Sequence, residues 1–267
     1  MNKLDVRPFF DKETKSLTYV VIDRASKQVA IIDSVLDFDP NTRQLSSGNA
    51  DKIIKFIDDN NLHLEWILET HAHSDHISAA RYLKEKRGGQ IGIGEHINKV
   101  QRDYKRAFNL NIEMEVINTP GHSPAGVSYK IEDALFVGNA LLMPDFGTDR
   151  TDLPSGSAKC LYQSIQRILS LPDTTRIFIG HDDKHLCRDE RFWETSVFQE
   201  KRDNIHLKNG TKEEEFIRNR FLCDLRSPPL RLLFPSVQMN LRAGRLPDKE
   251  CNGSSYLIMP LILGLVK

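Results

Sequence analysis

The chain has 267 residues, of which 39% are hydrophobic and 28% charged, and its formal net charge is +0. This composition is typical of a water-soluble globular protein that is long enough to bury one substantial core. Because basic and acidic residues balance, no overall field favours nucleic acid or an anionic membrane, and neither is expected as a partner.

In chain order, the first third predicts a β-hairpin followed by a helix. Residues 16–23 and 27–34 are rich in β-branched side chains and are separated by polar residues, which indicates two paired strands. Residues 51–60 carry isoleucines at helical spacing. Residues 64–69 predict a short strand that leads directly into a group of histidines.

The middle of the chain alternates between predicted helices and strands. Helices are expected over residues 77–86, 98–108 and 158–171, and the first of them ends at two glycines. Strands are expected over residues 90–95, 113–120, 126–131, 134–142 and 175–180. This alternation, with several hairpins, indicates an α/β protein with mixed sheets.

The character of the sequence changes after about Asp189. Residues 191–207 and 212–225 predict two helices, and the proline-rich chain beyond Arg226 is expected to be irregular. Too few periodic apolar positions remain there for a separate core. We therefore expect a main domain over residues 1–188 and an extension over residues 189–267 that packs on it.

The cysteines and the two ends of the chain bear on its location. The four cysteines, at positions 160, 187, 223 and 251, are scattered and form no CxxC pair, which favours reduced thiols. The N-terminal residues contain no apolar core of signal-peptide length, so a cytoplasmic protein is expected. The apolar residues 256–266 are too short to span a bilayer, and a terminal strand packed on the core is expected.

Metal-type side chains gather where predicted strands end, which is where rigid scaffolds usually hold functional groups. The candidate ligands are His71, His73, Asp75, His76, His122, Asn139 and His181. A lone histidine is most often a surface or capping residue, and this is the interpretation for His63, His96, His185 and His206. The HxHxDH grouping with two further strand-end histidines fits metal ligation far better, and such ligands suit zinc, iron or manganese.

The sequence resembles the metallo-β-lactamase fold superfamily. THAHSDH matches its HxHxDH motif, TPGHSPAGVSY its second histidine motif, VGNALLMPDFGTDRTD stands in the place of its third, and FIGHDD matches its last. The segments after residue 140, including FPSVQMNLRAGRLPDKECNG, are similar to the persulfide dioxygenase branch and its β-lactamase-hydrolase-like relatives. The resemblance implies a four-layer αββα sandwich with a C-terminal extension and a metal site at one edge of its two sheets.

The same resemblance implies one of two metal arrangements. In hydrolytic relatives such as glyoxalase II, one metal would bind to His71, His73 and His122. A second would bind to Asp75, His76 and His181, with a carboxylate at position 139 bridging the two. In persulfide dioxygenases a single Fe(II) is held at the positions of His71, His122 and 139, which leaves open positions for a substrate thiolate and dioxygen.

Two positions depart from the family pattern, and a third fits it. Asn139 stands where both branches have aspartate, so a neutral amide replaces a charged ligand and weaker metal binding is expected. Asp183 stands where the family often has tyrosine, and its carboxylate is a candidate catalytic group or replacement ligand. Arg150 matches a family arginine near the carboxylates of glutathione, for which a guanidinium is suited.

The leading hypothesis is a persulfide dioxygenase with one Fe(II) per chain that converts glutathione persulfide to sulfite and glutathione, weakened by Asn139. The alternative is a zinc-dependent hydrolase of a thioester or lactone, in which Asp75 orients a metal-activated water. A third hypothesis is a non-catalytic thiol-binding or sensor protein that keeps the fold. The expected partner is a small-molecule thiol or persulfide. Some relatives form dimers, and no feature of the chain decides whether it forms a homodimer.

Overall fold

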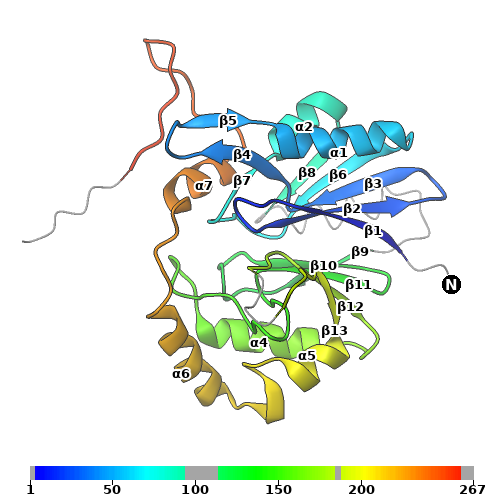
Figure 1. The fold of residues 1–267 in the computed structure, drawn as a ribbon, viewed down its shortest axis with the longest axis vertical. Coiled ribbons are helices and arrows are strands. Elements are labelled where there is room, and N and C mark those ends of the chain that lie inside the picture. Colours follow the sequence, from blue (N-terminus) through cyan, green and yellow to red (C-terminus); the bar gives the residue numbers. More distant parts are fainter. Residues whose placement is uncertain (1–3, 94–113, 184–187, 260–267) are drawn as a thin grey trace, which may run out of the picture.

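The computed structural model describes residues 4–93, 114–183 and 188–259, and two five-stranded sheets form its centre (Figure 1). The first sheet consists, in spatial order, of β1 (Asp5–Phe10), β2 (Leu17–Asp23), β3 (Gln28–Ile32), β6 (His63–Glu69) and β8 (Gln90–Ile93). The second consists of β13 (Glu194–Ser196), β12 (Arg176–Ile179), β11 (Ala134–Gly138), β10 (Val127–Ile131) and β9 (Met114–Asn118). A small third sheet contains β5 (Gln44–Ser46), β4 (Val35–Asp39) and β7 (Ile77–Ser78).

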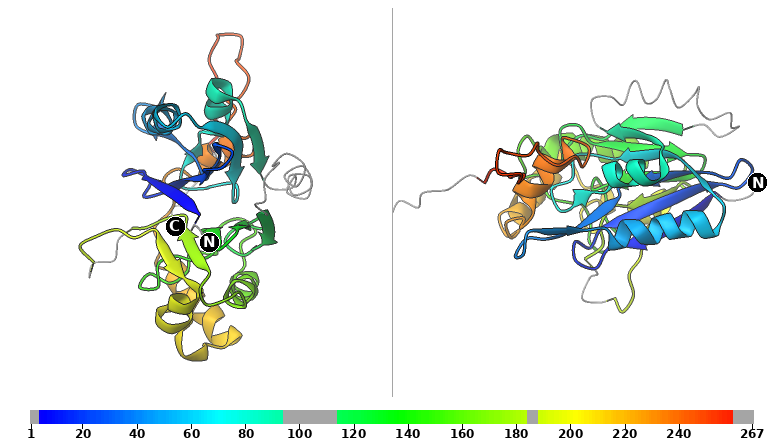
Figure 2. Two further views of the ribbon diagram at one scale, coloured as in Figure 1. Left: turned by 90° about the vertical axis from the view of Figure 1, so that its right-hand side faces the viewer. Right: turned by 90° about the horizontal axis from the view of Figure 1, so that it is seen from above.

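Helices cover the outer faces of the two large sheets, as both views in Figure 2 show. Helices α1 (Gly48–Asp59) and α2 (Ala80–Arg87) pack on the first sheet, and α4 (Ala158–Leu169) packs on the second. Helices α5 (Val197–Asp203) and α6 (Glu213–Asp224) pack beside α4, and the 3₁₀ turn η2 (Lys208–Gly210) lies between them in the chain. Helix α7 (Leu233–Asn240) lies beside β7, near the third sheet (Figure 1).

The alternation of side chains along each strand explains the layers. In β2, Tyr19 and Val21 belong to the apolar cluster between the two sheets, whereas Val20 and Ile22 pack against the isoleucines of α1. Successive strand residues point to opposite faces, so a strand that is apolar throughout needs cover on both sides. The sandwich therefore has four layers, and the predicted α/β fold of αββα type is confirmed.

Hydrogen bonds tie the sheets together at the edge where β6 and β12 end. The Tyr129 hydroxyl donates to the Glu69 carbonyl at 2.9 Å, and the Tyr19 hydroxyl donates to the Ile179 carbonyl at 2.5 Å. The backbone N–H groups of Leu17 and Val127 donate across the same edge, to the carbonyls of Gly180 and Thr70. The segments that follow β6 and β12 are thereby brought to one place.

Several predicted elements differ from the structure. Ile77 and Ser78 form strand β7, which pairs with β4, so the helix predicted from residue 77 begins only at Ala80. The strand predicted over 134–142 ends at Gly138, where a positive φ of 54° turns the chain. Pairing with a partner strand decided the first case, and local helical periodicity could not reveal it.

The region after residue 188 also differs from the prediction. Residues 194–196 form β13 rather than part of a helix, because they pair with β12, and Ser196 then caps α5 by accepting a hydrogen bond from the Gln199 N–H. The supposedly irregular chain beyond Arg226 contains α7. Since β13 completes the second sheet, this region does not lie wholly outside the sandwich, and the division at residue 188 stays a prediction.

The remaining differences concern the ends and the edges of the fold. Strands β1, β4 and β5 were not predicted. Residues 256–259 have no regular structure, and the side chains of Tyr256, Ile258 and Met259 are exposed, so the predicted terminal strand is wrong there. The rest of that segment and the helix predicted over 98–108 lie outside the described residues.

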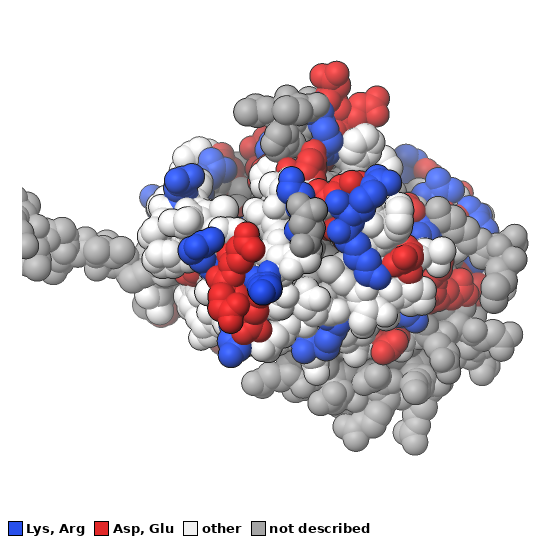
Figure 3. Space-filling view, turned by 90° about the horizontal axis from the view of Figure 1, so that it is seen from below, with Lys and Arg blue, Asp and Glu red and all other residues white. Residues whose placement is uncertain are grey.

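Two further observations concern the surface and length of the described elements. Basic and acidic side chains are interspersed among uncharged ones on the face shown in Figure 3. Within residues 4–93, 114–183 and 188–259, none of the helices is both apolar enough and long enough to cross a lipid bilayer. The cytoplasmic location stays a prediction.

Candidate metal centre

The loop between β6 and β7 forms one half of a buried cluster of imidazoles. His71, His73 and His76 are only 3%, 2% and 1% exposed. The ring centroid of His73 lies 4.0 Å from that of His71 and 4.1 Å from that of His76. His122, which follows β9, brings its ring centroid to 5.0 Å from that of His71.

Each of these four imidazoles leaves one potential ligand atom without a hydrogen bond, and so do the nearby Asp75 and His181. The buried atoms without a hydrogen-bond partner in the described part of the chain include Nε2 of His71, His76, His122 and His181, Nδ1 of His73, and Oδ1 of Asp75. Buried polar atoms without partners are rare in folded proteins, and a group of them requires an explanation. Nitrogen and carboxylate atoms grouped in this way fit divalent metal ions.

The opposite nitrogen of the loop histidines is held by polar groups behind the cluster. His71 Nδ1 lies 3.0 Å from Thr70 Oγ1, and His76 Nδ1 lies 3.1 Å from Ser16 Oγ. His122 Nδ1 lies 2.9 Å from the Arg150 carbonyl. Partners of this kind fix the orientation of an imidazole and determine which nitrogen is left for a metal.

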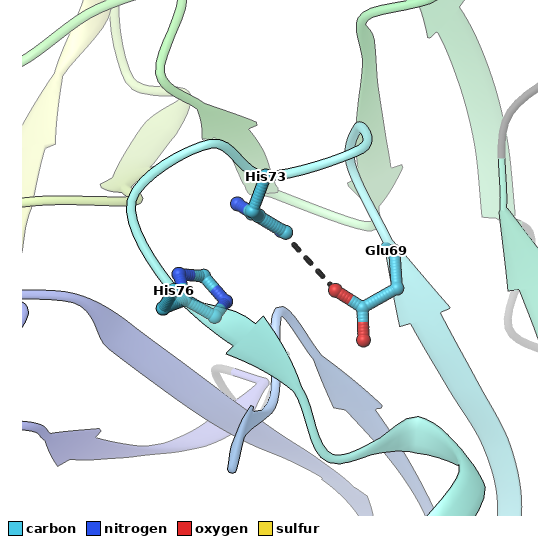
Figure 4. Close-up of side chains that lie close together, drawn as sticks. All are labelled: Glu69, His73 and His76. Carbon is cyan, nitrogen blue, oxygen red and sulfur yellow. Dashed lines mark ion pairs between the residues drawn. The ribbon is translucent and has the colours of Figure 1, made fainter. Parts of the chain in front are cut away.

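His73 is held by two buried carboxylates. Its Nε2 lies 3.0 Å from Asp33 Oδ1 and 3.1 Å from Glu69 Oε2, the ion pair that Figure 4 marks. The other oxygen of Glu69 accepts hydrogen bonds from Ser34 Oγ and Ser78 Oγ. Because Glu69 faces the nitrogen opposite the unpaired Nδ1, it acts as an outer partner of His73, although Glu69, His73 and His76 lie close enough together to form a ligand group.

Sequence reasoning missed both carboxylates. Asp33 follows the strand β3 and Glu69 ends β6. The rule that polar residues at strand ends carry function would have included them. Asp33 also accepts hydrogen bonds from the backbone N–H and the hydroxyl of Thr70, at 2.7 and 2.8 Å, so it fixes the first residue of the histidine loop.

The pKa shifts follow from burial and from these neighbours. Burial and the adjacent His73 and His122 lower the pKa of His71 well below its usual range. Burial also lowers the pKa of His73, but Asp33 and Glu69 outweigh it and raise that pKa well above the usual range. Burial raises the pKa of Asp75, yet the surrounding histidines, His76 first, bring it well below the usual range.

His181 and Asp183 form the more exposed part of the cluster. His181 Nε2 lies 3.5 Å from Asp183 Oδ1, and the two side chains are 18% and 48% exposed. Burial lowers the pKa of His181, but Asp183 and Asp75 outweigh it and raise the pKa to about 9. Asp183 therefore places a negative charge beside an atom that is otherwise suited to bind a metal.

Asn139 follows β11 and is 5% exposed. Among the described residues its side-chain amide forms no hydrogen bond. A Cβ atom added at Gly180 would come within 2.6 Å of Asn139 Oδ1, so glycine at position 180 leaves the space that this amide occupies. The side chain lines the same pocket as Asp75 and His181.

A pocket of about 440 Å³ opens onto the cluster. Its polar lining includes Asp75, His122, Asn139, His181 and Asp183, and its apolar lining includes Leu142, Phe146, Pro228, Pro229 and Leu230. Residues after 220 thus line part of the pocket, so the C-terminal part of the chain takes part in the site. A concave pocket with apolar walls and a few convergent polar groups is the usual form of a small-molecule site.

Arg150 and His206 also line this pocket. The Arg150 guanidinium is paired with Asp152 through two contacts of 2.6 Å, and it donates to the Pro228 carbonyl at 2.8 Å. His206, for which the sequence indicated no role, accepts a hydrogen bond from the Thr148 N–H. Burial and the nearby Arg220 lower the pKa of His206 to about 4, so this imidazole is neutral at pH 7.

The structure therefore brings the predicted ligands together: His71, His73 and His76 lie in the imidazole cluster with His122. The pocket beside it is lined by His122 and by the other candidates, Asp75, Asn139, Arg150, His181 and Asp183. The roles of these residues stay predictions. His63 is exposed, in agreement with an ordinary surface role. His96 and His185 lie outside the described residues.

An αββα sandwich with a histidine and aspartate cluster at the edge of its sheets defines a class of metal-binding proteins. The chain belongs to the metallo-beta-lactamase superfamily, whose family pattern matches residues 12–109. It is 39% identical over 286 residues to glyoxylase B2 of Dictyostelium discoideum, which covers 97% of this chain and 98% of that protein.

Two further relatives extend the comparison. The chain is 42% identical over 279 residues to the beta-lactamase hydrolase-like protein of Xylella fastidiosa (strain Temecula1 / ATCC 700964); this covers 96% of the chain but only 64% of that longer protein. It is 28% identical to the mitochondrial persulfide dioxygenase ETHE1 of Homo sapiens over 90% of the chain and 88% of the relative. The crystal structure of ETHE1 from Myxococcus xanthus is similar to this structure, with a TM-score of 0.73 and 29% sequence identity. The match covers 90% of this chain and 100% of the chain in that structure.

Proposed function

We propose that the protein is a metal-dependent enzyme of the persulfide dioxygenase type, acting on a small-molecule persulfide such as glutathione persulfide. One persulfide, one dioxygen and one water would give one thiol, one sulfite and two protons. The outer sulfur is oxidised and dioxygen is reduced, so no further reductant is required. The similarity to ETHE1 supports this proposal because it extends over nearly the whole chain, including the wall of the pocket that the residues after 220 form.

The observation that carries the proposal is the group of buried ligand atoms without a hydrogen bond, of which those of Asp75, His122 and His181 belong to residues that line the pocket. His71 Nε2 and His122 Nε2 would hold Fe(II), and the Asn139 amide lines the same pocket as His122. When bound, such an ion supplies positions for a thiolate and dioxygen. Asp183 would supply part of the negative charge that Asn139 lacks, because its carboxylate lies beside His181 at the same pocket.

The other pocket residues would bind and orient the substrate. Leu142, Phe146 and Leu230 offer apolar contacts that exclude water from the reacting sulfur. Arg150 would bind a substrate carboxylate by exchanging its present partner Asp152. The proposed enzyme is cytoplasmic, and size-exclusion chromatography with light scattering would measure whether it forms a homodimer.

A second function, a zinc-dependent hydrolase of a thioester or lactone, is favoured by a specific observation. Six potential ligand atoms lack a hydrogen bond. They are enough for the two sets of three that the resemblance implies, with His71, His73 and His122 in one and Asp75, His76 and His181 in the other. A single-iron site uses only two of these histidines. The names of glyoxylase B2 and the beta-lactamase hydrolase-like protein point in the same direction.

Metal analysis of protein purified without added metal tests the proposal, together with two assays. Oxygen uptake and sulfite release are measured with glutathione persulfide, and thioester hydrolysis is measured with S-lactoylglutathione. About one iron per chain with sulfite release supports the first function. About two zinc ions with thioester hydrolysis would replace it with the second. If the protein binds no metal and catalyses neither reaction but still binds a thiol, the result would support the hypothesis of a non-catalytic thiol-binding protein.

A further inference from the structure

Helix α7, in the C-terminal extension, contacts the histidine loop through one buried amide. Asn240 is the last residue of α7 and is fully buried. Its Nδ2 donates to the carbonyls of His73 and His76, both at 2.8 Å, and its Oδ1 accepts from the backbone N–H of Ser78 at 2.8 Å. The two donors and the acceptor of the amide are all used, so its orientation is fixed.

A second observation places the turn after α7 against the same segment. Gly244 has a positive φ of 78°, and its N–H donates to the Met239 carbonyl, which closes the C-terminal end of the helix. A Cβ atom at position 244 would lie 2.6 Å from the Ser78 carbonyl. Glycine is therefore required both by the backbone conformation and by the close approach to β7.

These contacts enclose the part of the loop that carries three candidate ligands. The two carbonyls that Asn240 holds belong to His73 and His76, on either side of Asp75. A loop backbone has no ladder of its own, so its direction depends on such external hydrogen bonds. Fixing residues 73, 76 and 78 together fixes the path along which the side chains at 73, 75 and 76 leave the backbone.

We propose that Asn240 is a positioning residue for the metal centre, and that the C-terminal extension is required for metal affinity through it. This inference rests on the proposed metal-dependent function. The chemistry of the site explains why an amide is needed. An aspartate has the same shape but no donor at neutral pH, so it would place a carboxylate oxygen against two carbonyl oxygens and would push the loop away.

The test compares Asn240→Asp with Gln238→Glu, the same change of amide to carboxylate on the same helix. Gln238 is half-buried, and its hydrogen bonds go to Phe234 and Ile258 rather than to the histidine loop. Both variants of the full chain are titrated with Co(II), and the visible absorption of the bound ion reports its ligands. Near-ultraviolet circular dichroism checks that the fold is intact. We expect Gln238→Glu to match the unaltered chain, and Asn240→Asp to bind Co(II) about 10- to 100-fold more weakly with altered visible bands, as other outer partners of metal ligands do. A folded Asn240→Asp protein with unchanged affinity and bands would overturn the inference.

Hydrogen exchange on the unaltered chain keeps the inference testable if Asn240→Asp does not fold. The Ser78 amide, which donates to Asn240, should exchange slowly, and more slowly still with Co(II) bound, while the amide of Ile57 in α1 should not respond to the ion. Rapid exchange at Ser78 in both states would contradict the contact. An unaltered chain that binds no Co(II) would contradict the proposed function, and protection at Ser78 without metal would then decide whether Asn240 holds the loop.

Discussion

The two sides of the candidate metal centre are held in different ways. On the side of the first sheet, His71, His73 and His76 are almost fully buried, and each has a polar partner behind its ring. On the side of the second sheet, the Asn139 amide has no hydrogen bond among the described residues, and His181 faces a half-exposed carboxylate. The first side is therefore pre-organised, as is His122, whose Nδ1 is held by the Arg150 carbonyl, whereas Asn139 and His181 on the second side are less constrained.

The two departures from the family pattern that the resemblance implies, at positions 139 and 183, both follow strands of the second sheet, β11 and β12, on the less constrained side. A substitution in the histidine loop would leave buried partners unsatisfied, which is costly. A substitution on the other side changes the charge of the site without breaking a buried network. Four substitutions test whether the two sides differ in this way.

Asp33→Ala should be the most damaging single change on the pre-organised side. It removes the acceptor of two Thr70 hydrogen bonds and the partner of His73 Nε2. Since these groups stay buried, we expect the free energy of unfolding of the metal-free protein to fall by about 3 kcal/mol or more, measured by urea denaturation. Asp59→Ala, an exposed change on α1, is the control. Equal unfolding midpoints for the two variants would show that Asp33 does not hold the loop.

Glu200→Gln tests whether a buried carboxyl group on the side of the second sheet makes the free energy of unfolding depend on pH. Glu200 accepts a hydrogen bond from Asn204, which also donates to the Gly147 carbonyl in the segment that leads to Arg150. Burial raises the pKa of Glu200 to about 8, although the Asn204 hydrogen bond opposes this. The folded state therefore retains a proton that the unfolded state releases near pH 4.5, so stability present below that pH is lost as the pH rises toward 8.

Removing this titration should make the Glu200→Gln variant more stable than the unaltered chain by a margin that grows from pH 5 to pH 8. We expect an increase of about 3 kcal/mol over that interval, measured by urea denaturation at several pH values. Glu214→Gln, at an exposed position of α6, should show no such trend. A difference that is the same at pH 5 and pH 8 would rule out a proton on Glu200.

Asn139→Asp should strengthen metal binding by adding a negative charge at the pocket floor. We expect an increase in Co(II) affinity of about tenfold, equivalent to about 1.4 kcal/mol, in a competition titration. Asn118→Asp, an exposed change on β9, controls for the net charge. Unchanged affinity in Asn139→Asp would mean that this side chain does not reach the metal, and the single-iron arrangement would lose one of its three positions.

Asp183→Asn should have the smallest effect, because solvent screens a half-exposed carboxylate. A loss of Co(II) affinity of about threefold is expected, from the same order of energy as other exposed ion pairs. The informative comparison is a double-mutant cycle with Asn139→Asp. If Asp183 supplies charge that Asn139 lacks, Asp183→Asn should reduce Co(II) affinity less when aspartate stands at position 139. An equal reduction with asparagine and with aspartate at position 139 would argue against this role.

The sequence alone determined the class of fold and the identity of the candidate ligands. Strands β2, β3, β6 and β10 and helices α1, α4 and α6 follow from local periodicity, which a window of neighbouring residues contains. The HxHxDH motif and the strand-end positions of His122 and His181 predict a metal centre before any coordinates are known. These signals are local in the chain, so the sequence displays them directly.

The contacts that hold those ligands in place join segments that are distant in the chain. Asp33 reaches His73 across 40 residues of sequence, and Asn240 reaches its carbonyl across 167. The same is true of β7 and β13, whose extended backbone depends on distant partner strands rather than on their own residues. Hydrogen bonds between segments far apart in the chain leave no periodic pattern, and they exist only once the two sheets and helix α7 have packed together.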